Sequence, residues 1–367
     1  MLNVMARANK ITYANEVPSS EGYIMPGEWE NHEATWLSWP HNPTDWPSKI
    51  DTIRWVYSEI VRKISASEIV RILVDSRAEE GRARKYLIRA GVDVERVEFF
   101  VQPTDRGWNR DSGPIFVRRK IGRKTSTAIV DFHFNAWAKY PDWRKDRRIA
   151  QFAARKLGKP LFNAQSNGRE FVLEGGGIDV NGRGTLLTTE ECYLDKRTQI
   201  RNPGLSRGDF EGALKEYLGA RKIFWLGKGI SGDDTHGHID DLCRFVNPTT
   251  IVLIREKQRR DVNWRALAEN WERIQDLRLE DGSKPEVIDL PMPEPLFFDN
   301  YRLPASYANF YITNAAVIVP TFNDTNDRSA LGILGELFKD RSVVGIHAVD
   351  LVLGFGTLHC LSQQQPA

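Results

Sequence analysis

The sequence predicts a mixed α/β fold that forms a single unit. Short runs rich in β-branched and aromatic residues alternate with segments of helical periodicity along most of the 367-residue chain. The recurring pattern is a β-hairpin plus a helix rather than a simple strand–helix–strand alternation. No segment is rich enough in Pro, Gly or Ser to separate two domains. We therefore expect one domain over residues 23–367, preceded by a polar, flexible extension over residues 1–22.

The elements are expected in the following order. Residues 25–46 carry four tryptophans interleaved with prolines and predict an irregular, aromatic-rich segment. Apolar runs beyond that segment predict strands, which we place at residues 68–75, 94–102, 113–119, 127–134, 171–189 (two strands), 222–226, 242–255 (two strands), 286–290, 310–320 and 342–353. Helical periodicity predicts helices, which we place at residues 77–91, 143–157, 210–218, 261–277 and 328–338. The pairs Asn181-Gly182 and Asn247-Pro248 are turn signals inside the two strand pairs.

Composition argues against several classes of protein. The 51 basic and 49 acidic residues leave a net charge of +2, which lacks the concentrated positive charge of a nucleic-acid-binding surface. The densest basic run, residues 118–124, is expected to be a solvated hairpin turn. No segment approaches the roughly 18 consecutive apolar residues of a membrane span. We expect a cytoplasmic protein that binds neither nucleic acid nor membrane.

The three cysteines are widely spaced and form no CxxC pair. An odd number at such spacing indicates neither a disulfide framework nor a structural zinc site, and it is typical of a reducing compartment.

Four polar segments carry candidate chemistry. In "WNRDSGP" (108–114), Asp111 either initiates a turn or serves a site. In "LEGGGI" (173–178), the glycines lack the lysine and the following helix of a phosphate-binding loop. Glu174 is therefore either part of a strand-end bulge or a carboxylate placed where the backbone must approach another group closely.

The third segment is "DDTHGHIDD" (233–241). If it is extended, the period of two places His236, His238 and Asp240 on one face. Three interpretations remain open: a polar loop, a metal site, or a histidine acid/base beside a carboxylate that holds the substrate. The binuclear metal pattern expects a histidine directly after the aspartate, where this chain has Asp241.

The fourth segment is the tail, "GFGTLHCLSQQQPA" (354–367). On a strand, His359 and Cys360 would point to opposite faces, so His359 would be a poor base for Cys360. A catalytic Cys360 would need a histidine from elsewhere, and the 233–241 segment supplies one. Taken alone, a buried structural cysteine is the competing interpretation.

Together these segments resemble the agmatine deiminase family of the guanidino-group-modifying superfamily, which includes bacterial peptidyl-arginine deiminase-like proteins. "MPGEWENHEATWLSWPHN", "WNRDSGP", "LEGGGI", "GHIDD" and "HCLSQQQP" follow in the family's order and span nearly the whole chain. The resemblance implies a five-bladed α/β propeller (the pentein fold) of ββαβ-type repeats with pseudo-fivefold symmetry.

The resemblance also implies a role for each motif residue. Cys360 would be the nucleophile that attacks the guanidinium carbon, and His238 the general acid/base. Asp111 and Asp240 would hold the guanidinium nitrogens, because carboxylates accept charge-assisted bidentate hydrogen bonds from that planar group. The remaining implied roles are support of the histidine by Glu174 and contact with the substrate by Trp108, Asp234 and Phe355. No metal and no cofactor is expected.

The expected reaction is hydrolysis of agmatine to N-carbamoylputrescine and ammonia. Free arginine and peptidyl arginine are the alternative substrates, and a metallohydrolase built on the HGHID segment is the alternative of another class. Asp234 matches a position where the family often has an acidic residue near the substrate amine, which favours agmatine over arginine. Phe355 and Thr357 depart from the family's "GGGNIHC" and bear on which substrate fits. The sequence is silent on oligomeric state, and we keep a homodimer as a candidate.

Overall fold

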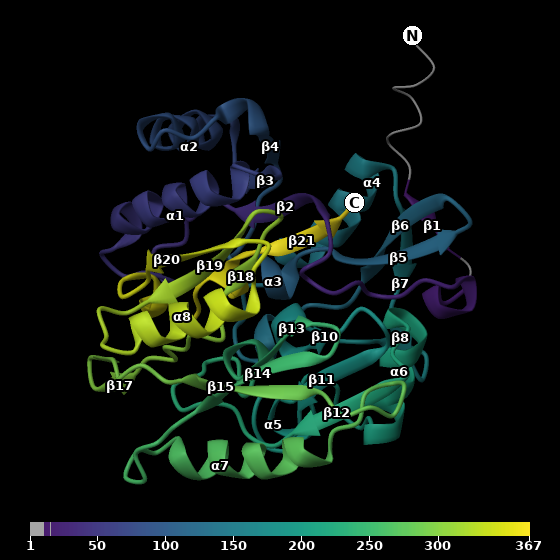
Figure 1. The fold of residues 1–367 in the computed structure, drawn as a ribbon. Helices are drawn as coiled ribbons and strands as arrows, with labels where there is room; N and C mark the ends of the chain where they lie inside the picture. Colours follow the sequence, from purple (N-terminus) through teal and green to yellow (C-terminus); the bar gives the residue numbers. More distant parts are fainter. Residues whose placement is uncertain (1–10, 15) are drawn as a thin grey trace.

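The computed structural model describes residues 11–14 and 16–367, in a mixed α/β arrangement with helices on the outside and sheets toward the middle (Figure 1). Among these residues, five sheets of three or four strands share one pattern, in which an antiparallel pair is extended by a parallel strand. The three strands that form this pattern are, sheet by sheet, β5 (Ile115–Ile121), β6 (Lys124–Asp131) and β7 (Pro160–Asn163); β10 (Asp179–Val180), β11 (Thr185–Thr189) and β12 (Lys222–Leu226); β13 (Cys243–Asn247), β14 (Thr250–Arg255) and β15 (Glu286–Pro291); β18 (Tyr311–Ile312), β19 (Ala316–Thr321) and β20 (Ser342–His347); and β21 (Gln363–Pro366), β2 (His32–Ser38) and β3 (Ile69–Val74). In each triple the first two strands are antiparallel and the third is parallel to its neighbour.

Smaller strands complete the sheets. β1 (Thr12–Tyr13) pairs in parallel with β7, and β4 (Val97–Val101) pairs in parallel with β3. Two hairpins stand apart from the five sheets, namely β8 (Gln165–Ser166) with β9 (Arg169–Glu170) and β16 (Phe297–Phe298) with β17 (Tyr301–Arg302). Residues 1–10 and 15 of the expected N-terminal extension lie outside the described residues.

Parallel neighbours need a crossover, and helices supply it in each sheet. These helices are α1 (Ile50–Ser65) and α2 (Arg77–Arg89) around β3, α4 (Ile149–Leu157) before β7, α5 (Glu190–Leu194) and α6 (Arg207–Leu218) before β12, α7 (Trp264–Arg273) before β15, and α8 (Asp327–Leu337) before β20. α6 shows how local sequence sets the boundaries: Ser206 and Asp209 form a capping box at its start, and Gly219 ends it with a φ of 68°. The predicted hairpin-plus-helix pattern is confirmed.

The sheet of β21, β2, β3 and β4 brings the last strand of the chain beside an early one. β21 pairs antiparallel with β2, so its residues next to the C-terminus lie beside a strand that begins at His32 (Figure 1). The sequence analysis expected neither β2, inside the aromatic-rich segment, nor α1. The basic run at 118–124 ends β5, forms the exposed turn at residues 122–123 and begins β6, so the predicted solvated turn is confirmed for its middle, whereas Arg118 and Arg119 are half-buried strand residues.

The fold places one short segment shortly before the outer strand of the antiparallel pair in each of the five sheets, namely β5, β10, β13, β18 and β21. These segments are α3 (Asn109–Ser112), the 3-10 turns Gly175–Gly177 and Ile239–Asp241, residues 306–309, and α9 (Leu358–Leu361). Hydrogen bonds connect all five: they link α3 to the first 3-10 turn and to α9, and residues 306–309 to the second 3-10 turn and to α9. All four candidate segments of the sequence analysis contribute to this meeting point.

Within the described residues, no helix combines the length and the apolar character that crossing a bilayer requires.

Candidate active site

The meeting point of the five segments opens into a cavity of about 140 Å³. Its walls include five residues that the sequence analysis assigned to the site: Trp108, Asp111, Asp234, Phe355 and Cys360. His238, Asp240 and Glu174 lie directly behind this wall and are fully buried. The structure therefore brings all eight predicted site residues together.

Cys360 lies in α9, a four-residue helix, and not on a strand as predicted. Its Sγ accepts a hydrogen bond from Asn309 Nδ2 at 3.0 Å and lies 3.6 Å from Asp240 Oδ2. The predicted strand alternation is also wrong for His359. Its ring does not contact Cys360, but it binds Asp240 Oδ2 through Nδ1 at 2.7 Å and Glu28 Oε2 through Nε2 at 2.9 Å.

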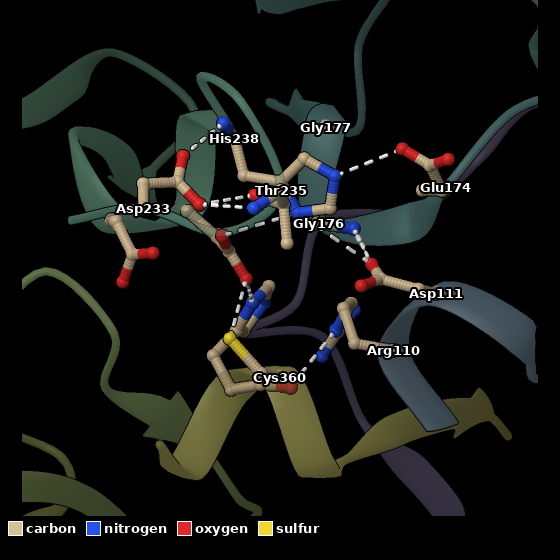
Figure 2. A network of polar contacts seen from close by, with 12 residues as sticks. Arg110, Asp111, Glu174, Gly176, Gly177, Asp233, Thr235, His238 and Cys360 are labelled. Atoms are coloured by element: carbon tan, nitrogen blue, oxygen red, sulfur yellow. Dashed lines mark hydrogen bonds and ion pairs between the residues drawn. The ribbon is translucent and has the colours of Figure 1, made fainter. Parts of the chain in front are cut away.

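His238 lies between three carboxylates (Figure 2). Its Nε2 donates to Glu174 Oε2 at 3.0 Å. Its Nδ1 faces Asp111 Oδ1 at 3.7 Å and Asp240 Oδ1 at 4.0 Å. Among the described residues, neither His238 Nδ1 nor Asp240 Oδ1 has a hydrogen-bond partner, although both atoms are buried. Such atoms are costly unless a ligand satisfies them.

The expected extended face of His236, His238 and Asp240 does not form. His236 has a φ of 62°, and residues 239–241 turn into a 3-10 helix. His236 instead binds Asp195 at 2.9 Å. Asp233 holds the loop, because its Oδ2 accepts hydrogen bonds from the backbone N–H groups of Gly237 and His238 (Figure 2). A metal site shared by the two histidines is therefore contradicted by the loop geometry.

The glycine cluster is explained by close approach, as predicted. A Cβ at Gly176 would lie 2.5 Å from His238 Nδ1 and 2.8 Å from Asp111 Oδ1, which no side chain could tolerate. The Gly176 N–H donates to Asp111 Oδ1 at 2.9 Å. The second oxygen of Asp111 accepts a hydrogen bond from Trp137 Nε1 at 2.9 Å. These two donors orient the Asp111 carboxylate toward the cavity.

The surroundings shift the acidities of the site in different directions. Burial raises the pKa of Asp111 to about 6. Burial also raises the pKa of the Cys360 thiol, and the carboxylates of Asp240, Asp241 and Asp111 raise it further. The thiol is therefore the resting form, and a bound cation would favour the thiolate.

For two other groups, charged neighbours outweigh burial. Burial alone would lower the pKa of His238, but Asp111, Cys192 and Glu174 hold it well above its ordinary value. Burial alone would raise the pKa of Asp240, but His359 and His238 hold it below its ordinary value. The site thus holds a protonated imidazole beside an ionised carboxylate.

Glu174 is the residue that positions His238. The Arg201 guanidinium donates to both of its oxygens, at 3.1 and 3.2 Å. Burial would raise the pKa of Glu174, but Arg201 and His238 lower it, so that the carboxylate stays charged and accepts the His238 N–H.

Asp234 lies at the cavity wall with both oxygens already engaged. Lys139 Nζ pairs with Oδ1, and Tyr140 Oη donates to Oδ2 at 2.7 Å. Phe355 has a φ of 65°, in the left-handed region, and lines the same cavity. The cavity also contains Arg106, which pairs with Asp45 at 2.5 Å and stacks on Tyr140.

Four residues of the site escaped the sequence analysis: Glu28, Trp137, Arg201 and Asn309. Trp137 belongs to a run of three residues with positive φ, which has no sequence signature. Asn309 could have been found from the sequence, because it lies two residues before a strand and the motif residues also lie shortly before strands. Glu28 lies inside a quoted motif, but its partners are contributed by distant segments.

Comparison with known proteins agrees with this geometry. The model of a family described as Porphyromonas-type peptidyl-arginine deiminase matches residues 24–366. An agmatine deiminase of Stutzerimonas stutzeri (strain A1501) is 34% identical over 97% of this chain and 99% of its own length.

Solved structures show the same similarity. The agmatine deiminase of Enterococcus faecalis superposes with a TM-score of 0.87 at 30% identity, over 97% of this chain and 99% of its own. A C. jejuni agmatine deiminase, solved as a cysteine-to-serine variant with substrate bound, gives a TM-score of 0.82 at 30% identity, over 94% and 96% of the two chains.

Proposed function

The chain belongs to the Porphyromonas-type peptidyl-arginine deiminase family, and on that premise we propose that it hydrolyses agmatine to N-carbamoylputrescine and ammonia. One observation carries the proposal. The Cys360 thiol, the unpaired His238 Nδ1 and the unpaired Asp240 Oδ1 converge at a cavity that Asp111 also lines. This set of groups suits a planar cation that must be held by carboxylates and attacked by sulfur.

The first half of the reaction forms a covalent intermediate. Asp111 and Asp240 accept hydrogen bonds from the guanidinium. The thiol proton points toward Asp240 Oδ2 in the free enzyme, and the bound cation favours its release to solvent, which leaves the thiolate. Sγ then adds to the guanidinium carbon. His238 donates the proton on Nδ1 to the departing nitrogen, the C–N bond breaks, and ammonia leaves an S-alkylthiouronium on Cys360.

The second half reverses the role of the histidine. Neutral His238 takes a proton from water through Nδ1 while Glu174 keeps its ring in place through Nε2. The oxygen adds to the same carbon, and the C–S bond breaks with Sγ leaving as a thiolate. The remaining hydroxyl proton passes to Sγ, so the ureido product leaves a Cys360 thiol beside a protonated His238, as at the start.

The charge of the cavity favours agmatine over arginine. Its charged wall residues are the carboxylates of Asp45, Asp111 and Asp234 against the single guanidinium of Arg106. An excess of negative charge suits a substrate with a cation at each end. The α-carboxylate of arginine would need a free cation, but Arg106 is already paired with Asp45 and Asp142, and Lys139 with Asp234.

A panel of guanidines compared by kcat/KM tests this proposal. We expect agmatine to exceed free arginine and an arginyl peptide by about two to three powers of ten, because an unpaired buried charge costs roughly 3–5 kcal/mol. Cys360→Ser should remove ureido formation without loss of folding, and activity should survive extensive chelation. Equal values for arginine and agmatine would refute the substrate, whereas undiminished turnover by Cys360→Ser or a chelator-sensitive activity would refute the mechanism.

The repeated sheets support a proposal on the architecture as well. We propose that the five sheets are the blades of a pseudo-fivefold α/β propeller, with the five pre-strand segments meeting at its axis. What supports this is the shared strand order of the sheets and the contacts between those segments.

A further inference from the structure

Each of the five pre-strand segments contributes a residue to the site. Among the described residues of these segments, Asn309 is the one site residue that lies outside the sequence motifs. It precedes β18 and is fully buried. Its side chain contacts Cys360 directly, with Nδ2 at 3.0 Å from Sγ. The same Nδ2 donates to Asp241 Oδ1 at 2.9 Å. The amide therefore lies between the nucleophile and a carboxylate.

The neighbours of Asn309 determine which way its amide points. Oδ1 accepts hydrogen bonds from Thr357 Oγ1 at 2.7 Å and from the backbone N–H groups of His359 and Cys360 at 3.1 and 3.4 Å. A flipped amide would place its NH2 group against two N–H donors and its oxygen against Asp241. The NH2 group must therefore face the sulfur.

The groups around Sγ explain why such a donor matters. Burial removes water from the thiol and raises its pKa, and the neighbouring carboxyl groups of Asp240, Asp241 and Asp111 raise it further. Asn309 is a neutral donor in direct contact with Sγ. A hydrogen bond to an ionised group is stronger than one to a neutral group, so this contact gains strength when the thiol loses its proton.

We propose that Asn309 is a catalytic residue whose amide N–H group stabilises the Cys360 thiolate, both before attack and when the sulfur is expelled. The inference rests on the proposed role of Cys360 as nucleophile and adds a donor from the one sheet that otherwise contributes no site residue. Thr357 and the α9 backbone keep this donor aimed at the sulfur.

The experiment measures the thiol rather than turnover. Alkylation of Cys360 by iodoacetamide is followed across pH by mass spectrometry in the wild type, Asn309→Ala and Asn309→Asp. We expect alkylation at a fixed pH below the thiol pKa to fall about ten- to a hundredfold in Asn309→Ala, with the wild-type rate regained at higher pH. Asn309→Asp should show at least the same loss, because it exchanges the donor for an acceptor.

Matched variants separate a catalytic from a structural role. Asn270→Asp makes the same change at a buried asparagine that bonds only the backbone of residues 227 and 228, and it should leave the alkylation profile in place. Cys360→Ser gives the background from Cys192 and Cys243. Should Asn309→Ala not fold, Asn309→Ser takes its place, with the same expected profile.

An unchanged alkylation profile in the folded Asn309 variants overturns the proposal. Alkylation needs no guanidine, so this result is independent of the agmatine panel. If agmatine is not preferred but the alkylation profile shifts in the Asn309 variants, the proposed substrate is refuted and the role of Asn309 stands. If agmatine is preferred but the alkylation profile does not shift, only the role of Asn309 is refuted.

Discussion

A single carboxyl group makes binding of a cationic substrate depend on pH. Burial raises the pKa of Asp111 to about 6, so this group is protonated and neutral below that pH in the free enzyme. A neutral Asp111 loses its charge-assisted hydrogen bonds to a guanidinium. Agmatine recognition should therefore weaken at a pH at which the protein remains folded.

We predict that kcat/KM for agmatine falls about tenfold per pH unit below about pH 6. Initial rates measured from about pH 4.5 to about pH 8 cover the titration of this carboxyl group. Asp45 is the control, because burial raises its pKa to about 6 as well. If the fall of kcat/KM below about pH 6 stays at the same pH in Asp45→Asn, it belongs to Asp111. If this fall disappears in that variant, the assignment to Asp111 is contradicted.

Lys139 shows how one exposed residue can compete with a substrate. Its ammonium pairs with Asp234, the carboxylate expected to hold the ammonium end of agmatine. We predict that Lys139→Met lowers KM for agmatine about three- to fivefold with little change in kcat, because an exposed ion pair contributes less than about 1 kcal/mol. Lys145→Met, which removes a comparable exposed charge paired with Asp105, is the control.

A different outcome for Lys139→Met would assign that residue the opposite role. If arginine turnover falls and agmatine is unaffected, Lys139 binds the α-carboxylate, and the preference for agmatine is contradicted.

At the scale of elements, the short helix α9 and the strand β21 connect the nucleophile to the rest of the protein. β21 carries three consecutive buried glutamines beside β2. The Gln365 side chain accepts hydrogen bonds from Trp36 Nε1 at 2.9 Å and from the Arg71 guanidinium. Polar residues are rare in a buried strand, and here two of the three serve specific donors, because Gln364 Oε1 likewise accepts a hydrogen bond from the Arg110 guanidinium at 2.7 Å.

We predict that Gln365→Leu lowers the free energy of unfolding by about 2–4 kcal/mol, because it leaves two buried donors, one of them charged, without an acceptor. Gln275→Leu, at an exposed position after α7, should change it by less than about 0.5 kcal/mol. Urea denaturation measures both. Equal stabilities of the two variants would contradict the role assigned to β21.

At the scale of the whole molecule, Glu28 joins segments that belong to four sheets. Its carboxylate accepts hydrogen bonds from Arg110 in α3, Arg244 in β13, the Ile312 N–H in β18 and His359 in α9, at 2.9 to 3.1 Å. Burial alone would raise the pKa of Glu28, but Arg244, His359 and Arg110 hold it well below its ordinary value. Because His359 in turn binds Asp240, this contact also supports the site.

The direction of the pKa shift sets the pH dependence of stability. A carboxyl group whose pKa is lower in the folded than in the unfolded state stabilises the fold above the unfolded value of about 4.5, and this contribution is lost as the pH falls further. We predict that Glu28→Gln lowers the free energy of unfolding by about 3–5 kcal/mol at neutral pH, because it leaves two buried arginines undercompensated.

The difference in the free energy of unfolding between the wild type and Glu28→Gln should then become smaller below about pH 4.5, because the wild type loses the same charge. Urea denaturation at several pH values measures this gap. Glu33→Gln, which alters a half-exposed carboxylate paired with Arg71, should differ from the wild type in free energy of unfolding by a small amount that is nearly the same at every pH. A gap that widens on acidification would contradict the role of Glu28.

The sequence by itself determined the hairpin-plus-helix pattern and the residue types that carry the chemistry. Cys360, His238, Asp111, Asp240 and Glu174 could be named as candidates because each lies in a short polar motif beside apolar strands, and the resemblance of these motifs to a known family gave each candidate its role. Local patterns of this kind depend on side chains that are neighbours along the chain.

Only the tertiary structure decided how these residues face one another. Four residues are too few for periodicity to separate a helix from a strand, so the conformation around His359 and Cys360 was predicted wrongly. The partners of His359, Asn309 and Glu28 are in most cases more than 50 positions away along the chain. Contacts at such separation arise because the sheets bring their pre-strand segments together, and no local pattern records which residues then meet.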